Sequence, residues 1–141
     1  MEQRVSSASG EFAEAALQAD SGGLVSADKI VASVEKIVEL AHPVRVVAFG
    51  SRARGSHHAE SDLDLAVILK EFDPQHDQPP VRRSDLDVWM PIDLLVFGQQ
   101  RHDFMKDSII SVHHEIATEG VTLYDAGVGS IDLGAVARIA R

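Results

Sequence analysis

The sequence predicts an α/β (α+β) fold in which helices pack on a small mixed β-sheet. Two observations predict it. The stretch "SADKIVASVEKIVELAH" repeats its apolar residues at helical spacing. Short runs rich in β-branched and other apolar residues then follow, separated by loops that contain glycine or proline. A chain of 141 residues is long enough for one domain with a substantial core, and too short for two.

The first helix is expected to begin after Ser26, whose hydroxyl is suited to capping a helix N-terminus. Ile30 and Val34 would lie on its buried face, and Pro43 follows closely enough to end it. We expect residues 1–25, which precede it, to form a flexible leader.

The later elements follow from the same patterns. We expect strands over 44–49, 62–69, 91–97 and 121–125. Two short helices are expected over 99–105 and 108–120. The predicted domain therefore spans residues 26–125, and residues 126–141 form a C-terminal tail with the weak pattern of a short helix.

Charge and cysteine content limit the range of functions. The net charge is −9, and an acidic surface repels phosphate backbones, so no extended nucleic-acid surface is expected. The absence of cysteine excludes disulfides and thiolate metal sites, and it is typical of a cytoplasmic protein. Neither a membrane span nor a secretory signal is expected, because no long apolar run or basic–apolar leader occurs.

The tetrapeptide SDLD occurs twice, and its first copy opens the second expected strand. Because side chains alternate along a strand, Asp62 and Asp64 would project from one face while the leucines beside them enter the core. Asp93 interrupts the apolar strand "PIDLLVF", and a carboxylate in that position needs a partner. If the two strands are neighbours, three carboxylates converge, and such an oxygen-only group suits Mg²⁺ or Mn²⁺.

The second SDLD copy, at residues 84–87, does not open a long apolar strand and has no third carboxylate expected beside it. It follows a proline-rich loop and comes directly after Arg82 and Arg83, which could pair with its aspartates. We interpret it as a helix cap or a solvated turn, and not as a metal site.

A glycine-containing turn, "GSRARG", follows the first expected strand. Small residues at Gly50 and Ser51 allow backbone N–H groups to approach phosphate oxygens, and the serine hydroxyl is a further donor. Arg52 and Arg54 are additional candidate cations for a bound nucleotide, although arginines in such a loop are as often merely solvated. On its own the turn would be read as structural.

Taken together, "GSRARG", "SDLDL" and Asp93 resemble the minimal nucleotidyltransferases of the DNA polymerase beta superfamily. The pattern there is a Gly-Ser turn, an Asp-x-Asp pair and a third aspartate on a later strand. Small stand-alone members often end in a segment similar to "EGVTLYD" at residues 119–125. The resemblance covers residues 28–125 and implies the nucleotidyltransferase (polymerase beta-like) fold.

The resemblance also implies an activity, in which a nucleoside monophosphate moves from a nucleoside triphosphate to a hydroxyl acceptor and pyrophosphate leaves. By this analogy Asp62, Asp64 and Asp93 are the catalytic and metal-binding residues, and they hold two ions of Mg²⁺ or Mn²⁺. Gly50 and Ser51 would bind the β- and γ-phosphates, with Arg52 and Arg54 as additional nucleotide-binding residues. ATP is the nucleotide that the analogy favours.

The acceptor is left open by the residues themselves. Only 48 residues follow Asp93, too few for a separate substrate-binding domain, so the resemblance favours a protein acceptor. In bacteria and archaea, similar domains are often antitoxins that pair with a helical HEPN-type toxin, and some attach AMP to a toxin tyrosine. Two alternatives remain: a non-catalytic antitoxin that acts by docking, and a dimeric nucleotidyltransferase that modifies an antibiotic. The sequence does not determine the oligomeric state.

Overall fold

The structure, a computed structural model, describes residues 24–57 and 61–141. The leader expected at residues 1–25 lies almost entirely outside the described residues. Its last residue, Val25, is buried at the start of the folded domain, so the leader ends earlier than the sequence suggested.

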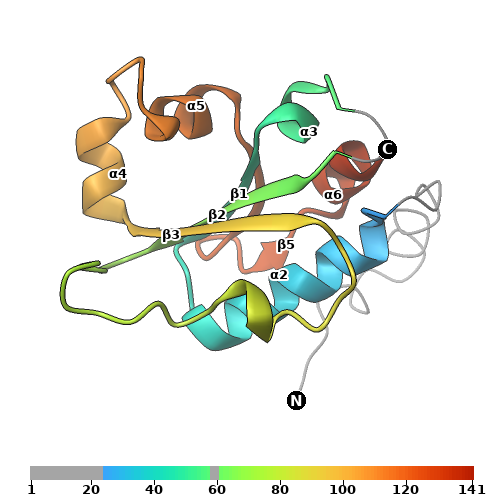
Figure 1. Cartoon of the computed structure of the whole chain (residues 1–141), viewed down its shortest axis with the longest axis horizontal. Helices are drawn as coiled ribbons and strands as arrows, with labels where there is room; N and C mark the ends of the chain where they lie inside the picture. The colour runs from blue at the N-terminus through green and yellow to red at the C-terminus, as the bar shows by residue number, and fades with distance from the viewer. Residues whose placement is uncertain (1–23, 58–60) are drawn as a thin grey trace.

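Helices and strands follow the predicted order (Figure 1). They are α2 (Ala27–Ala41), β1 (Arg45–Phe49), α3 (Ser51–Arg54), β2 (Leu63–Leu69), the 3₁₀ turn η2 (Arg83–Asp85), β3 (Ile92–Gly98), α4 (Gln99–Met105), α5 (Val112–Glu119), β4 (Val121–Asp125), β5 (Ser130–Ile131) and α6 (Leu133–Ala140). The predicted mixed sheet with packed helices is confirmed, and β5 and η2 are additional to the prediction.

Serine hydroxyls cap two of the helices: Ser26 caps α2 as expected, and Ser111 caps α5, which begins later than the expected residue 108. The Ser26 hydroxyl accepts a hydrogen bond from the Lys29 backbone N–H at 3.4 Å, and α2 ends at His42, whose backbone is left-handed with φ 47°. In α5 the Ser111 hydroxyl accepts from the His114 N–H at 3.2 Å. These bonds satisfy backbone donors that the first turn of a helix would otherwise leave unpaired.

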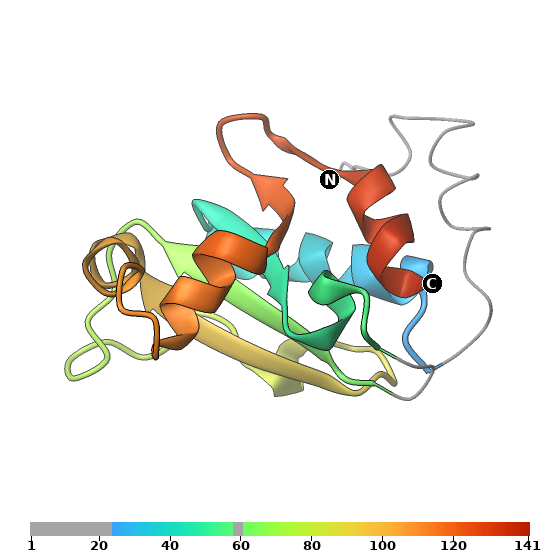
Figure 2. The ribbon, with the colours of Figure 1, turned by 90° about the horizontal axis from the view of Figure 1, so that it is seen from above.

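The five strands form one sheet in the order β3-β2-β1-β4-β5. Neighbouring strands are antiparallel except β2 and β3, which are parallel. A parallel pair needs a crossover connection, and the connection from Lys70 to Pro91 supplies it. The strand order makes β3 an edge strand, which lies at one side of the sheet in both views (Figures 1 and 2).

Two layers of helices cover the sheet. On one face α2 and α6 cover a core that includes the alternate β2 residues Leu63, Leu65 and Val67. On the other face α5 and the side chains near α4 pack on Ala66 and Ile68. The alternation along β2 therefore buries both faces of the strand beyond Asp64 (Figure 1).

The C-terminal segment is part of the domain, which corrects the boundary expected at residue 125. The helix expected in the tail is present as α6, and it buries residues of the main core: Leu133, Val136, Ala137, Ile139 and Ala140. The apolar face of α6 packs against α2 and the sheet, so this segment contributes to the core of the domain.

The crossover connection also differs from its expected character. It is largely irregular, but Val81, Leu86 and Met90 are buried and close the core beneath β3. Trp89, in the same connection, is 82% exposed. Across residues 24–57 and 61–141, every helix is too short or too polar to cross a lipid bilayer.

Candidate functional site

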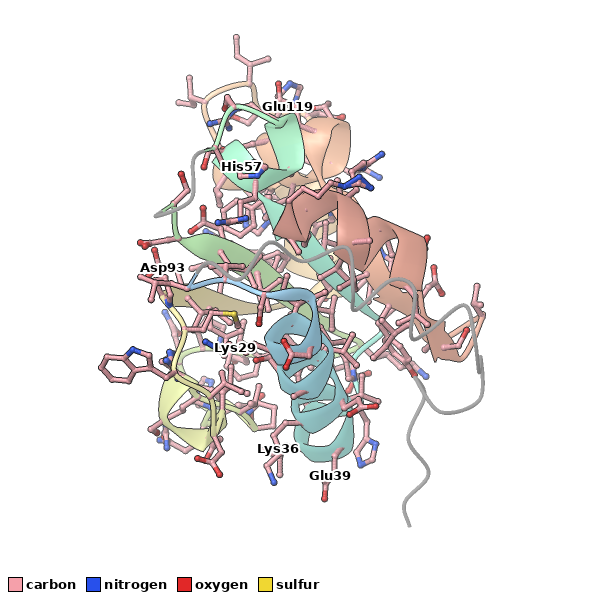
Figure 3. All side chains as sticks on the ribbon, turned by 90° about the vertical axis from the view of Figure 1, so that its right-hand side faces the viewer. Lys29, Lys36, Glu39, His57, Asp93 and Glu119 are labelled. Atoms are coloured by element: carbon pink, nitrogen blue, oxygen red, sulfur yellow. The ribbon has the colours of Figure 1, made fainter. Side chains whose placement is uncertain are left out.

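Asp64 and Asp93 lie directly opposite each other on the parallel strands β2 and β3. Partners in such a register project from the same face, so the sheet itself brings the two carboxyl groups together. This juxtaposition was predicted on the condition that the strands were neighbours, and the strand order satisfies it. Asp93 is exposed at the edge of the sheet (Figure 3), whereas Asp64 is half-buried.

Burial, together with the charge of the adjacent Asp93 and a side-chain hydrogen bond to it, raises the pKa of the Asp64 carboxyl group to about 6. The charges of Asp62 and Glu115 contribute in the same direction. A carboxyl group with neighbours of its own sign is stabilised by a proton or by a bound cation.

Asp62 is less closely fixed than the other two aspartates. It is exposed and precedes Leu63, the first residue of β2, so strand pairing does not constrain its side chain. The expected strand began one residue earlier. Within the described residues, no three or more His, Asp or Glu side chains are arranged as an assembled metal site. The structure thus brings together two of the three predicted ligands, and the charge of the third acts on Asp64.

The Gly50 turn lies against Asp64. Gly50 has φ 77° and ψ −157°, a conformation that essentially only glycine adopts. A Cβ atom at this position would overlap the Asp64 carboxylate. Ser51 begins α3 directly after this turn and is half-buried. The predicted phosphate-binding turn and the predicted metal-binding carboxylate are therefore immediate neighbours.

Arg52 has a structural role in place of the nucleotide-binding role that the sequence suggested. Its side chain is 3% exposed. The guanidinium donates from Nε to the Ser61 carbonyl at 3.1 Å and from Nη1 to the Ile139 carbonyl at 2.8 Å. These bonds connect α3 to the start of β2 and to the last turn of α6. Sequence reasoning missed this role because Ile139 lies 87 residues away.

Arg54 is exposed at the end of α3, as a nucleotide-binding cation should be. Its Nη1 donates to the Glu115 carboxylate at 2.8 Å and lies 3.8 Å from the Glu119 carboxylate. The same Glu115 oxygen, Oε2, accepts a hydrogen bond from the Gly50 backbone N–H at 3.1 Å. Both glutamates belong to α5, so this helix supplies negative charge to the turn; Glu119 is labelled in Figure 3.

Glu115 is the residue of this site that the sequence did not reveal. It lies 65 residues after Gly50, in the segment "HHEIATEG", which offers no motif for this contact. Only the packing of α5 against β1 brings it to the turn.

The second SDLD copy forms the solvated cap that was expected. Asp85 ends η2, and its carboxylate accepts a hydrogen bond from the Arg82 backbone N–H at 2.8 Å. Asp87 is exposed. This copy lies in the crossover connection and belongs to a different local structure from Asp64.

Chemically, the site combines a carboxyl pair, a glycine turn with backbone donors, and an exposed arginine. Oxygen ligands of this kind bind hard divalent cations, and the donors of the turn bind anions. The arrangement is suited to a ligand that carries both charges, such as a metal-bound polyphosphate.

Comparisons with known proteins agree with this chemistry. A family model described as "Nucleotidyltransferase domain" matches residues 28–120, which include all the residues of the site. A crystal structure of a putative nucleotidyltransferase from Sulfolobus solfataricus has the same fold, with a TM-score of 0.50 and 18% sequence identity. The similarity covers 88% of this chain and 96% of that chain. A comparison with curated proteins finds no significant match.

Proposed function

The chain belongs to the nucleotidyltransferase domain family, and on this premise we propose that it transfers AMP from ATP to a hydroxyl group of a partner protein. The observation that carries the proposal is the in-register pair Asp64–Asp93 beside the Gly50–Ser51 turn. One part of this arrangement suits a cation and the other suits a phosphate chain.

The transfer forms one bond and breaks another. The acceptor oxygen bonds to the α-phosphorus, the bond from that phosphorus to the β-bridging oxygen breaks, and pyrophosphate leaves with the electron pair. In our proposal the exposed Asp93 receives the hydroxyl proton, and the Gly50 N–H, Ser51 and Arg54 orient the β- and γ-phosphates.

The carboxyl groups suit divalent ions of the Mg²⁺ or Mn²⁺ type. Asp64 and Asp93 would hold them together with Asp62, whose exposed side chain is free of strand constraints. A carboxyl group whose pKa is raised to about 6 by burial and by neighbouring charge is a position at which a cation relieves repulsion. Such ions supply charge neutralisation for the phosphate oxygens when bound.

The position of Asp93 favours a large acceptor. The residue lies on an edge strand of the sheet, and its side chain is exposed. A hydroxyl group on the surface of another protein can approach Asp93 from this side without entering a closed pocket.

We propose a helical HEPN-type toxin as the partner, so that the chain is the antitoxin and acts by AMPylation. This part of the proposal rests on the resemblance to minimal nucleotidyltransferases, since no residue of the site identifies a particular partner.

The test is a transfer assay with ATP labelled at the α-phosphate, Mg²⁺ and the purified partner. We expect label on the partner, and no label when the γ-phosphate carries it. Asp64→Asn and Asp93→Asn should each lower the rate by at least about a hundredfold, because each removes an anionic ligand of the reacting centre. The matched control is Asp87→Asn in the second SDLD copy, which should keep the wild-type rate.

Two results would contradict the proposal. If Asp64→Asn kept the full rate, the site assignment would be wrong. If the partner were neutralised equally well by an Asp64→Asn, Asp93→Asn double variant and carried no label, the protein would act by docking instead.

A further inference from the structure

The Glu115 carboxylate binds two separate donors of the turn that follows β1. Its Oε2 accepts hydrogen bonds from the Gly50 backbone N–H at 3.1 Å and from Arg54 Nη1 at 2.8 Å. One donor belongs to the main chain and the other to an exposed side chain, and a single oxygen atom holds both.

These two donors are of the kind that bind phosphate. Backbone N–H groups in a glycine turn and guanidinium groups both form charge-assisted hydrogen bonds to anionic oxygens. A carboxylate offers the same type of oxygen as a phosphate, so the two compete for the donors. An anion from α5 therefore already occupies positions that the proposed function assigns to the triphosphate.

Charge repulsion opposes the presence of the Glu115 carboxylate and the triphosphate at the turn at the same time. Glu115 lies close enough to Asp64 for its charge to act on that carboxyl group, which also faces Asp62 and Asp93. A triphosphate adds several negative charges at this point, and together with the three aspartates it already outweighs the charge of two divalent cations, so none is left to balance Glu115.

The Glu115 side chain is able to leave. It is 33% exposed, and its partner Arg54 is 43% exposed, so neither group is enclosed by the core. Ion pairs with this exposure are worth little, because water replaces them readily. By contrast, the buried guanidinium of Arg52 in the same turn is fixed by two backbone carbonyl groups. Replacing the Glu115 carboxylate by a phosphate group would thus move only the Glu115 and Arg54 side chains and leave the backbone of the turn in place.

We propose that Glu115 is an affinity-determining residue of the nucleotide site, which holds the Gly50 N–H and Arg54 until the triphosphate displaces it. The inference rests on the proposed function and adds a competing internal anion to it. Wild-type affinity for the nucleotide is lower than the turn alone would give, because binding must first break the contacts of Glu115.

The test compares Glu115→Gln with Glu119→Gln. The first variant keeps the size of the side chain and an acceptor for the Gly50 N–H, but it removes the charge. The second removes an equal charge from the same helix, at a residue that lies 3.8 Å from Arg54. Affinity is measured by calorimetry with Mg²⁺ and an ATP analogue whose α–β bridge cannot be cleaved.

We expect Glu115→Gln to lower the Kd for the analogue by about threefold to tenfold, the range for losing a competing charged hydrogen bond at a partly exposed site. Glu119→Gln should change the Kd by less than about twofold. Without nucleotide, Glu115→Gln should have a slightly lower Tm than wild type, and the analogue should raise that Tm by more.

An unchanged or higher Kd in a folded Glu115→Gln protein would overturn the inference, because Glu115 would then only support the turn. An equal fall in Kd in both variants would also overturn it, since a general charge effect would explain the result. If the wild-type protein did not bind the analogue with Mg²⁺, the proposed function itself would fail, and this outcome is distinguishable from the other two.

Discussion

Gly50 and Asp64 lie so close together that the turn after β1 leaves no room for a side chain at position 50. A Cβ atom on Gly50 would overlap the Asp64 Oδ2 atom, and the backbone conformation at φ 77° is one that other residues rarely adopt. The backbone of the turn can therefore approach the carboxyl group directly.

Replacing Gly50 should damage both the fold and the site. We expect Gly50→Ala to lower the free energy of unfolding by about 2–3 kcal/mol, from backbone strain and displacement of Asp64, and to abolish transfer. Chemical denaturation and the transfer assay check this. Gly55→Ala is the control: Gly55 has φ 78°, but its added Cβ would meet nothing within 4 Å, so only the strain remains. Equal effects of the two changes on activity would contradict the role of the Gly50–Asp64 contact.

Asp64→Asn should stabilise the metal-free protein while it abolishes transfer. The pKa of Asp64 is raised to about 6 in the folded protein, above the usual value of about 3.9, so the ionised carboxylate opposes folding at neutral pH. We expect a gain of about 1 kcal/mol at pH 7.5, after allowance for solvent screening, and the gain should vanish as the pH falls from 6 to 4.

Denaturation with a chelator present, at a series of pH values, measures this gain. Adding Mg²⁺ and ATP should reverse the order of stability, because the wild-type carboxylate then has a cation to bind. A variant that is less stable than wild type at pH 7.5 without metal would contradict the prediction.

Substituting Arg52 should lower the stability of the protein, whereas substituting Arg54 should weaken its interaction with ATP. Arg52→Met removes a buried guanidinium that binds the Ser61 and Ile139 carbonyl groups, so we expect a loss of about 2–4 kcal/mol in unfolding free energy. Arg54→Met removes an exposed group, and it should change stability by less than about 1 kcal/mol. Measured at a temperature where both variants are folded, only Arg54→Met should raise the KM for ATP. A raised KM in Arg52→Met alone would contradict the structural role of Arg52.

A buried histidine pair should make stability depend on pH. His102 and His113 are 2% and 8% exposed, their Nδ1 atoms lie 3.1 Å apart, and both rings contact Phe97. A hydrogen bond between the two nitrogens requires a proton on one and a lone pair on the other. Burial lowers the pKa of both residues, and the charge of His113 lowers that of His102 further.

Because the folded-state pKa values are depressed, the stability of the pair is present above about pH 6.5 and is lost as the pH falls below it. We expect the Tm to fall between pH 7 and pH 5, with a weaker fall in a His102→Phe, His113→Leu double variant. The exposed His76 serves as a control, and His76→Gln should follow the wild-type curve. A double variant with an unchanged pH dependence would show that other groups cause it.

The sequence by itself determined most of the elements of this protein and most of the residues of its site. Helical spacing and the cap at Ser26 define α2, because these are interactions between near neighbours in the chain. The alternation around Asp64 placed its carboxyl group opposite the buried leucines for the same local reason.

Only the tertiary structure decided which distant groups meet. The parallel register of β2 and β3 sets Asp93 opposite Asp64, and the packing of α5 brings Glu115 to Gly50. Packing also placed Arg52 inside the domain, against the sequence-based expectation. The physical reason is that local patterns fix local conformation, whereas strand register and burial depend on how all the apolar surfaces of the chain are covered together.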